Sequence, residues 1–264
     1  MIVEVRHRTL LTYSEPIAET YMQVRLRPRD GAGQVVRRFT LTVAPRSEAR
    51  SYLDGFGNHV HYFNHVPPHA EVEVIGHSVV ATSAGIPDPE DGEFPDDFLQ
   101  FRGPVMDVAG VRAIARRFTA GTAEERLDRL AAYINQHIEY RPQTTDVYTA
   151  VDEVLHNHVG VCQDFAHLFI SVARAMEIPT RYVSGYIHAG KGRRGAGASH
   201  AWAEALVPGS GWIGYDPTNP IRASEHHVRV AVGRDYQDIS PTRGTFVGRA
   251  RETMAVEVET ALRE

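Results

Sequence analysis

The segment from Gly160 to Pro179 constrains the fold of this chain more than any other stretch. After Cys162, its apolar residues recur at steps of three and four, which is helical spacing. These residues are Phe165, Leu168, Phe169, Val172, Ala173 and Met176. Pro179 ends the pattern, because the residue before a proline tends to leave the helical region. The sequence therefore predicts a helix of about four turns, with Cys162 in its first turn.

Cys162 is the only cysteine of the chain, and its position allows two interpretations. The free amide groups and the positive dipole end of a helix N-terminus favour an anion. A thiol placed there ionises more readily than an ordinary one, which suits a nucleophile. A lone cysteine at the start of an apolar helix is, however, most often a small buried hydrophobe. Cys162 by itself does not separate the two interpretations.

The composition of the chain excludes several classes of protein. Its residues are 42% hydrophobic and 23% charged, which is typical of a globular rather than a disordered chain. The net charge of −5 argues against nucleic acid or an anionic membrane as a partner. No apolar run reaches transmembrane length, and residues 1–7 lack the core of a signal peptide. A single cysteine excludes an intramolecular disulfide, and we expect a cytoplasmic protein.

Residues 1–83 are expected to form a small antiparallel β domain, a sandwich or a barrel. Short segments of alternating polarity indicate strands, and Asp54-Gly55 and Gly57-Asn58 are turn signals between them. The strand segments are 2–6, 23–27, 39–43, 60–63 and 70–75. From 84 to 104 the chain is rich in proline, glycine and acidic residues, which is linker composition. We therefore place a domain boundary there.

Residues 105–264 are expected to form an α+β domain with a C-terminal tail. Helical spacing marks 108–118 and the segment after Thr122, where Thr122 and Glu125 have the pattern of a capping box. A shorter helix is expected at 149–155. The apolar period then changes to two at 180–187, 199–206 and 212–216, which predicts an antiparallel meander. From about residue 222 only short extended pieces are visible.

His200 and Asp216 complete a candidate catalytic group with Cys162. His200 lies near the start of one predicted strand and Asp216 at the end of the next. If these strands pair as a hairpin, the two residues become neighbours. A cysteine nucleophile needs a base that shares its proton and a second group that orients the imidazole. Each residue alone is a weak signal, but the three in helix, strand and strand are a much stronger one.

Four segments of the second domain resemble the core motifs of the transglutaminase-like superfamily. They are 160–167 (GVCQDFAH), 181–186 (RYVSGY), 200–204 (HAWAE) and 211–218 (GWIGYDPT). The N-terminal strands with the motif LDGFGN at 53–58, and the segment VGRDYQD at 232–238, are similar to a bacterial branch that includes cysteine peptidases. The resemblance implies a papain-like triad of Cys162, His200 and Asp216. It also implies that the cysteine-bearing helix packs on an antiparallel sheet.

The chemistry that this resemblance implies is acyl transfer through a thioester of Cys162. The thiolate would attack a carbonyl carbon, the oxyanion would form near the Cys162 amide, and His200 would protonate the leaving amine. A second oxyanion donor is expected upstream of the cysteine. Tyr140 is the candidate, with Tyr148 behind it, although a core tyrosine with a satisfied hydroxyl is an equal alternative. No cofactor and no metal are expected.

For several neighbouring side chains, a structural role is an alternative to a functional one. Gln163 and Asp164 are candidates for lining the cleft, but an acid in the first turn of a helix is favourable through the dipole alone. His167, five residues after Cys162, is expected to point away from it and to be structural. Trp202 and Trp212 are expected to be buried against the helix rather than to stack on substrate.

Basic and histidine-rich segments also stand out. Arg193 and Arg194 lie in a glycine-rich loop that could gate the cleft or attract an acidic peptide, but a solvated loop is the simpler expectation. No role is assigned to His156, His158, His226 or His227.

Four functions remain open at this point. The first is a cysteine peptidase or amidase acting on a peptide or protein, and the second is a protein-glutamine transglutaminase. The sequence does not separate these two, because both use one triad and differ in the acceptor. The third is a noncatalytic peptide-binding module on the same fold. The fourth is a metal site built from Cys162, His200 and Asp216. The sequence does not indicate the substrate, the oligomeric state or the role of the N-terminal domain.

Overall fold

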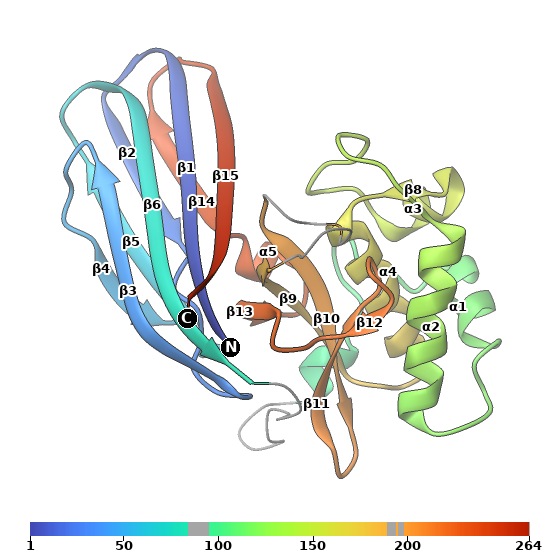
Figure 1. Cartoon of the computed structure of the whole chain (residues 1–264). Coiled ribbons are helices and arrows are strands. Elements are labelled where there is room, and N and C mark those ends of the chain that lie inside the picture. Colours follow the sequence, from blue (N-terminus) through green and yellow to red (C-terminus); the bar gives the residue numbers. More distant parts are fainter. Residues whose placement is uncertain (84–94, 189–193, 195–197, 264) are drawn as a thin grey trace.

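Two antiparallel sheets pack face to face in one half of the molecule, on the left of Figure 1. The computed structural model describes residues 1–83, 95–188, 194 and 198–263. The strands of this half are β1 (Ile2–Ile17), β2 (Glu19–Val24), β3 (Gln34–Ala44), β4 (Arg50–Leu53), β5 (His59–His65), β6 (His69–Thr82), β14 (Thr242–Val247) and β15 (Glu252–Arg263). One sheet has the order β15-β1-β6-β3, and the other has the order β14-β2-β5-β4.

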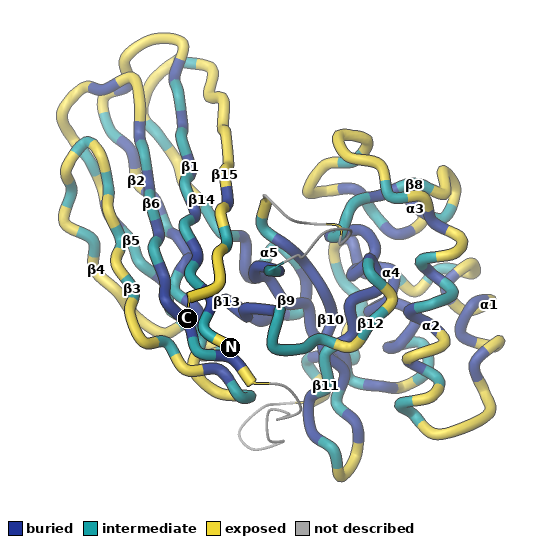
Figure 2. The backbone as a smooth tube through the Cα atoms, viewed as in Figure 1, coloured by how far each residue is buried: buried dark blue, intermediate teal, exposed yellow. Residues whose placement is uncertain are grey.

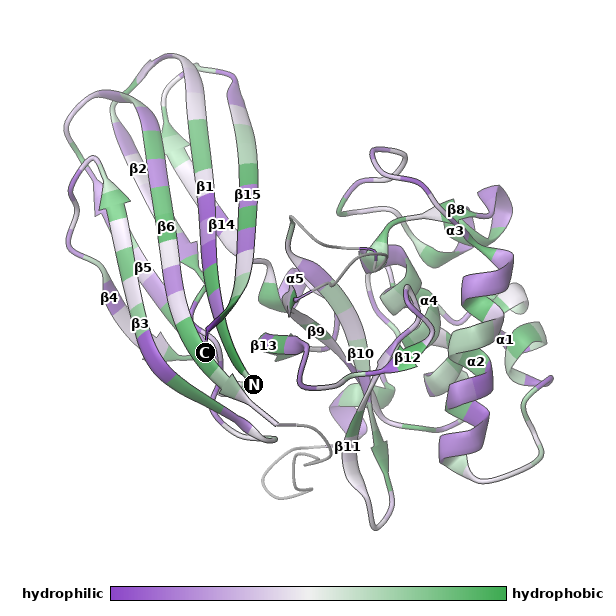
Figure 3. Cartoon of the chain, in the orientation of Figure 1, coloured by the Kyte–Doolittle hydropathy of each residue, from purple (hydrophilic) through white to green (hydrophobic). Residues whose placement is uncertain are grey.

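Alternating polarity is the reason that these strands form a sandwich. Along β1, residues from Ile2 to Tyr13 alternate between half-buried and buried, so every second side chain points inward. Figure 3 shows the same alternation as hydrophilic and hydrophobic bands along the strands. Apolar residues of both sheets meet in a shared core, which contains Leu11, Tyr13, Ile17, Met22, Val24, Leu26, Phe63, Val72 and Val74. The expected small antiparallel β domain is confirmed as a sandwich.

The C-terminal strands correct the expected extent of the second domain. β15 pairs with β1 from Ile2↔Arg263 to Tyr13↔Glu252, and β14 pairs with β2 from Thr242↔Val24 to Val247↔Glu19. Residues 242–263 are therefore strands of the N-terminal sandwich and not a tail of the region from 105 onward. Their pattern was weak because β15 is exposed along most of its length. The pairing itself joins residues more than two hundred positions apart, which no local pattern encodes.

Helices and a second antiparallel sheet form the other half of the molecule. The helices are α1 (Ala109–Ala115), α2 (Ala123–His137), α3 (Val151–Asn157), α4 (Cys162–Ala175) and α5 (Tyr236–Ile239). The strands are β7 (Glu139–Tyr140), β8 (Val159–Gly160), β9 (Thr180–Ile187), β10 (His200–Val207), β11 (Gly211–Asp216), β12 (Ile221–Arg222) and β13 (His227–Gly233). Five of them form a sheet with the order β12-β11-β10-β9-β13, while β7 and β8 pair in parallel.

Helix α4 is the centre of this half. It is buried along almost its whole length, between the sheet and the other helices (Figure 2). The apolar spacing after Cys162 therefore predicted the helix correctly, and the packing on the sheet that the resemblance implied is confirmed. Helix α2 begins with the expected capping box, in which Thr122 accepts from the Glu125 backbone and Glu125 from the Thr122 backbone. The expected α+β fold is confirmed.

The two tryptophans are buried, but not against α4 as expected. Ala201, Ala203 and Ala205 of β10 belong to the core that contains α4, whereas Trp202 packs with Val183 and Val232 on the other face of the sheet. Small residues thus face the helix, and the alternation of the strand sends the large ring away from it.

Trp212 is also buried by a segment that the sequence assigned to the linker. Residues 84–94 of that linker lie outside the described residues, but 95–99 form a short 3-10 helix, η1 (Pro95–Leu99). Phe98 is 2% exposed, and its ring lies 5.2 Å from Trp212 and 6.0 Å from Phe56. The second half of the expected linker is therefore packed at the junction of the two halves.

Two carboxamide side chains cover the free edge of β13, the last strand of the five-stranded sheet. Gln34 donates to the Arg229 carbonyl (2.8 Å) and accepts from the Arg229 amide (2.9 Å). Asn58 makes the same pair of bonds with Val232, each at 2.8 Å. An exposed strand edge carries unpaired backbone groups that must be covered. Here the N-terminal sandwich covers them.

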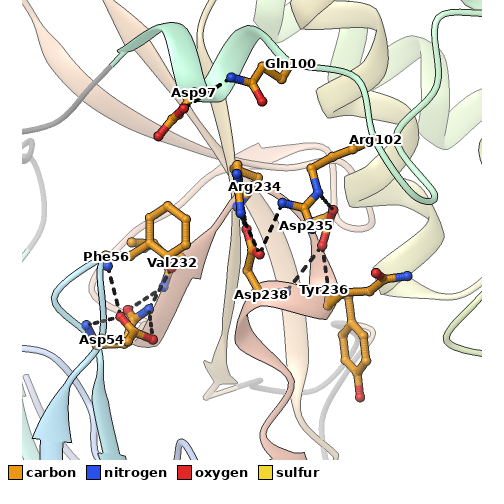
Figure 4. A network of polar contacts seen from close by, with 12 residues as sticks. Asp54, Phe56, Asp97, Gln100, Arg102, Val232, Arg234, Asp235, Tyr236 and Asp238 are labelled. Carbon is orange, nitrogen blue, oxygen red and sulfur yellow. Dashed lines mark hydrogen bonds and ion pairs between the residues drawn. The ribbon is translucent and has the colours of Figure 1, made fainter.

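Figure 4 shows the polar contacts that hold both sides of this junction. The Asp54 carboxylate accepts from the amides of Phe56 and Asn58, each at 3.0 Å, and so fixes the turn that presents Asn58. On the other side, Asp235 caps α5 and pairs with Arg102 at 3.2 Å. The two segments that resembled the bacterial branch, 53–58 and 232–238, thus meet at one place. None of the described helices is long and apolar enough to span a lipid bilayer.

Replacing Asn58 tests the junction. Asn58→Ala leaves the buried amide and carbonyl of Val232 without their partners, at a cost of about 1–3 kcal/mol for each group. We expect the free energy of unfolding, measured by urea titration, to fall by about 2–6 kcal/mol. Asn64→Ala is the matched control, because Asn64 is exposed and its side chain, among the described residues, bonds to Glu19 at 3.1 Å. Equal effects of the two substitutions would contradict this role of Asn58.

Candidate active site

Cys162 is the first residue of α4 and follows the short strand β8 directly. Tyr140 of β7 pairs with Gly160 of β8, so the tyrosine is held two residues from the cysteine across the parallel pair. Cys162 is neither fully buried nor fully exposed. The first amides of a helix have no intrahelical partner, so the Cys162 amide can serve an oxyanion. The predicted position in the first helical turn is confirmed.

Asp164 holds the start of α4. Its carboxylate accepts from the Val161 amide at 2.7 Å and from the Thr145 hydroxyl at 2.6 Å, and the residue is 1% exposed. Burial raises the pKa of Asp164, and these two hydrogen bonds oppose the increase. A Cβ on Gly160 would lie 2.8 Å from the Asp164 Cβ, so a glycine is required there. A contact of Asp164 with substrate stays a prediction. Gln163 is buried, and its proposed contact with substrate stays a prediction.

His200 and Asp216 are neighbours, as the predicted hairpin required. Strands β10 and β11 pair antiparallel, with Ala203 opposite Tyr215. The His200 Nε2 lies 2.8 Å from the Asp216 Oδ2, and both side chains are completely buried. Because the carboxylate can only accept, Nε2 carries the proton and Nδ1 is the free ring nitrogen. Nδ1 is buried and has no other protein partner among the described residues.

The charges of this pair favour an imidazolium beside a carboxylate. Burial lowers the pKa of His200, but the Asp216 charge and hydrogen bond outweigh it and raise this pKa to about 10. The Cys162 side chain contributes to the increase, which places the thiol beside the imidazole. Burial alone would raise the pKa of Asp216, yet His200 and then His227 hold it well below its usual range.

Asp216 also accepts hydrogen bonds from the turn that follows it. Its Oδ1 accepts from the amides of Thr218 (3.0 Å) and Asn219 (3.3 Å), and its Oδ2 accepts from the Asn219 side chain at 2.8 Å. A buried carboxylate is stable only when such donors replace its lost water. The Asp-Pro step at 216–217 thus forms a turn that satisfies the acid.

His227 is a part of this site that sequence reasoning missed. Its Nε2 lies 3.3 Å from the Asp216 Oδ2, and its Nδ1 accepts from the Ser224 amide at 3.1 Å. The second bond fixes the tautomer, because a nitrogen that accepts has no proton and Nε2 must carry it. His227 therefore donates to Asp216 as a neutral imidazole. The sequence assigned no role to His227, and no local pattern marked its contact with Asp216, because β13 and β11 are not adjacent in the sheet.

A metal site is disfavoured by the same tautomer. The ligand atoms that converge among the described residues belong to His200, Asp216 and His227, within 4.8 Å of one another, and not to the set with Cys162. A histidine that binds metal through Nε2 normally donates its other N–H to an acceptor. In His227 that other nitrogen faces an N–H of the backbone. The three residues fit a hydrogen-bonded ion pair better than a cation.

Tyr140 lies close enough to Cys162 for their charges to interact. Burial raises the pKa of Tyr140, Cys162 adds to this increase, and Arg194 opposes it. The candidate oxyanion donor is therefore near the nucleophile, while its role stays a prediction. Tyr148 is 75% exposed. Tyr182 of β9 is a second tyrosine whose pKa burial and Cys162 raise, and the sequence did not single it out.

His167 is structural, as expected. It is completely buried, its Nε2 accepts from the Tyr236 amide at 3.2 Å, and burial lowers its pKa to about 3. Arg193 lies outside the described residues. Arg194 is described, and its guanidinium stands over the Tyr140 ring, 5.5 Å from the centroid.

Comparison with known families agrees with this geometry. The model for the "Transglutaminase-like superfamily" matches residues 112–217, and the model for the "Bacterial transglutaminase-like N-terminal region" matches residues 3–81. The first match contains Cys162, His200 and Asp216. The second covers most of the sandwich except its C-terminal strands.

Relatives of similar length and a similar solved structure are also known. An uncharacterized protein of Mycobacterium leprae is 34% identical, and the match covers 97% of each chain. An uncharacterized protein of Mycobacterium tuberculosis is 33% identical, over 91% of this chain and 86% of that one. A crystal structure from Cytophaga hutchinsonii, provisionally described as a cysteine protease, superposes with a TM-score of 0.79 at 21% identity, over 100% of this chain and 92% of that one. That similarity shows the same fold.

Gly160→Ala tests the geometry at the start of α4. The added Cβ would push the Asp164 carboxylate away from the Val161 amide and displace Cys162. We expect the rate at which iodoacetamide labels Cys162 in the native protein to change at least about threefold, with a loss of about 1–3 kcal/mol in unfolding free energy. Gly55→Ala is the control, because nothing lies within 4 Å of a Cβ there. An unchanged labelling rate in Gly160→Ala would refute the tight packing.

His227 variants test its hold on Asp216. His227→Ala removes one hydrogen bond to a buried charge, so we expect Cys162 labelling at pH 7 to slow by about tenfold. His227→Gln retains an N–H donor and should recover much of the rate. Unfolding free energies measured in parallel separate this effect from simple destabilisation. If both variants label as the parent does, His227 only fills space.

Proposed function

The chain belongs to the transglutaminase-like superfamily, and we propose that it catalyses thiol-dependent acyl transfer at an amide bond, with hydrolysis of a peptide or amide as the reaction. One observation carries the proposal. His200 gives Nε2 to a buried carboxylate and leaves Nδ1 free beside the thiol at a helix N-terminus. This is the arrangement that a cysteine nucleophile, its general base and an orienting acid require.

The proposed first step is attack by the Cys162 thiolate on the carbonyl carbon of the substrate. Carbon–sulfur bond formation moves the negative charge to the carbonyl oxygen, where the Cys162 amide and the Tyr140 hydroxyl are the candidate donors. The Nδ1–H of His200 then protonates the leaving amine as the carbon–nitrogen bond breaks. The products of this step are a thioester on Cys162, a free amine and a neutral His200.

The second step is cleavage of the thioester by water. Neutral His200 takes a proton from the water molecule, the oxygen attacks the thioester, and the sulfur leaves as a thiolate. Asp216 stays ionised throughout and keeps the imidazole in one tautomer. The proposal uses a peptide or protein substrate and no cofactor, and it places the protein in the cytoplasm.

An amine acceptor in the second step would give transglutaminase chemistry instead. The same thioester serves both reactions, and the outcome depends on access of water and of the amine. The assay is therefore run with a glutamine-containing protein such as casein, with and without the fluorescent amine dansylcadaverine. Peptide products support hydrolysis, whereas fluorescent casein with released ammonia supports crosslinking. If neither product forms, the result supports the binding-module alternative.

The pH dependence of thiol labelling tests the role of His200. The pKa of His200 is raised to about 10, so its cationic form, and the stabilisation of the thiolate, is fully present near neutral pH. The cationic form of His200, and with it this stabilisation, is lost as the pH rises through about 10. We expect iodoacetamide to label Cys162 at pH 6 at least about tenfold faster in the parent than in His200→Ala, with the difference narrowing toward pH 10.

A matched variant and one clear failure complete this test. His156→Ala removes an exposed histidine of α3 and should label like the parent. Intact mass reports the reaction without ambiguity because the chain has one cysteine. Equal labelling rates for the parent and His200→Ala at pH 6 would refute the proposed thiolate–imidazolium pair.

A further inference from the structure

We propose that Arg194 is a specificity-determining residue that selects acyl donors with a carboxylate next to the amide bond that reacts. The inference rests on the proposed function and names the class of its substrate. Sequence reasoning favoured a simple solvated loop for this arginine. The contacts of Arg194 lead to a different conclusion.

The backbone of Arg194 is fastened to the turn that follows Asp216. Its amide donates to the Asn219 Oδ1 at 2.9 Å, and its carbonyl accepts from the Asn219 Nδ2 at 3.2 Å. The same Nδ2 donates to the Asp216 Oδ2 at 2.8 Å. One carboxamide thus ties Arg194 to the acid that orients His200. Arg194 therefore has a defined position relative to the candidate catalytic group.

The side chain of Arg194 extends from that anchor to Tyr140. Its guanidinium carbon lies 5.5 Å from the centroid of the Tyr140 ring. Tyr140 is paired with Gly160, two residues before Cys162. The charges of Arg194 and Cys162 both act on Tyr140, in opposite directions. A positive charge therefore stands beside Tyr140, the candidate oxyanion donor, whose own place is next to the start of α4.

No carboxylate of the described residues forms an ion pair with Arg194, although the residue is exposed. Other arginines of this half have such partners: Arg141 pairs with Glu139, and Arg222 with both Glu124 and Asp128. A guanidinium presents a planar fork of N–H donors that fits a carboxylate. An acidic group of the substrate can therefore supply the missing partner, which favours an aspartate or glutamate beside the bond that reacts.

Two alkylating reagents test the electrostatic effect of Arg194 at Cys162 without any substrate. Iodoacetate carries a carboxylate next to its reactive carbon, and iodoacetamide is its neutral analogue. The ratio of their rates at Cys162 cancels general changes in thiol reactivity. We expect this ratio to fall about threefold in Arg194→Gln, which is the size of effect for a unit charge several ångströms away in water. In Arg194→Glu it should fall further.

The control for this test is Arg243→Gln. Arg243 is an exposed residue of β14 in the sandwich, so the substitution makes the same change in net charge far from Cys162. It should leave the ratio unchanged. An equal ratio in the parent and Arg194→Gln, or an equal fall in both Gln variants, would overturn the proposal. This outcome is separate from a failure of the proposed function, because alkylation needs only an accessible thiol.

Peptide mixtures test the substrate class itself. The protein is incubated with a tryptic peptide library, and new termini are identified by mass spectrometry. We expect acidic residues to be enriched next to the cleaved bonds for the parent, and basic residues to replace them for Arg194→Glu. Cleavage with the same residue preference in both proteins would refute the assignment of Arg194. If no peptide is cleaved but the ratio of iodoacetate to iodoacetamide rates still falls in Arg194→Gln, the result counts against hydrolysis. The electrostatic effect of Arg194 on Cys162 would then still be established.

Discussion

A single buried carboxylate, that of Asp216, is the constraint on which the site depends. An ionised acid without water is tolerated only when several donors surround it, and here they come from β10, from β13 and from the turn after β11. His200 and His227 bind one oxygen, the amides of Thr218 and Asn219 bind the other, and the Asn219 side chain also contributes. Satisfying this one charge thereby determines the tautomers of both histidines and the position of the turn. The reactive nitrogen of His200 faces Cys162 as a consequence.

The N-terminal sandwich contributes to the site through β13, although it supplies no side chain to the candidate triad. This strand carries His227 at its start and is the last strand of its sheet. Gln34 and Asn58 cover its free edge with carboxamides that bond as a neighbouring strand would. The position of His227 therefore depends on contacts that the sandwich makes, and the sandwich in turn needs β14 and β15 from the end of the chain. Both ends of the sequence thus support a site that is formed in its middle.

Local patterns predicted those parts of the structure that short stretches of sequence determine. The apolar steps after Cys162 predicted α4, the hairpin of β10 and β11 brought His200 to Asp216, and the resemblance pointed to the family. The errors have one physical cause, since each concerns contacts between distant segments. The partners of β14 and β15, the face of the sheet that Trp202 occupies, and the contact of His227 with Asp216 depend on how strands are ordered.

The arrangement of charge around Cys162 follows from the same constraint and explains why the site needs an acid and not an amide at position 216. Asparagine there would present a neutral oxygen, and burial would then lower the pKa of His200 instead of the Asp216 charge raising it. The imidazole would be neutral near pH 7, and no positive charge would stand beside the Cys162 side chain. His227 cannot replace that charge, because its bond from the Ser224 amide keeps it neutral. A chain of hydrogen bonds thus leads from the backbone at Ser224, through His227, Asp216 and His200, to the side of the thiol, and each link determines the proton position of the next.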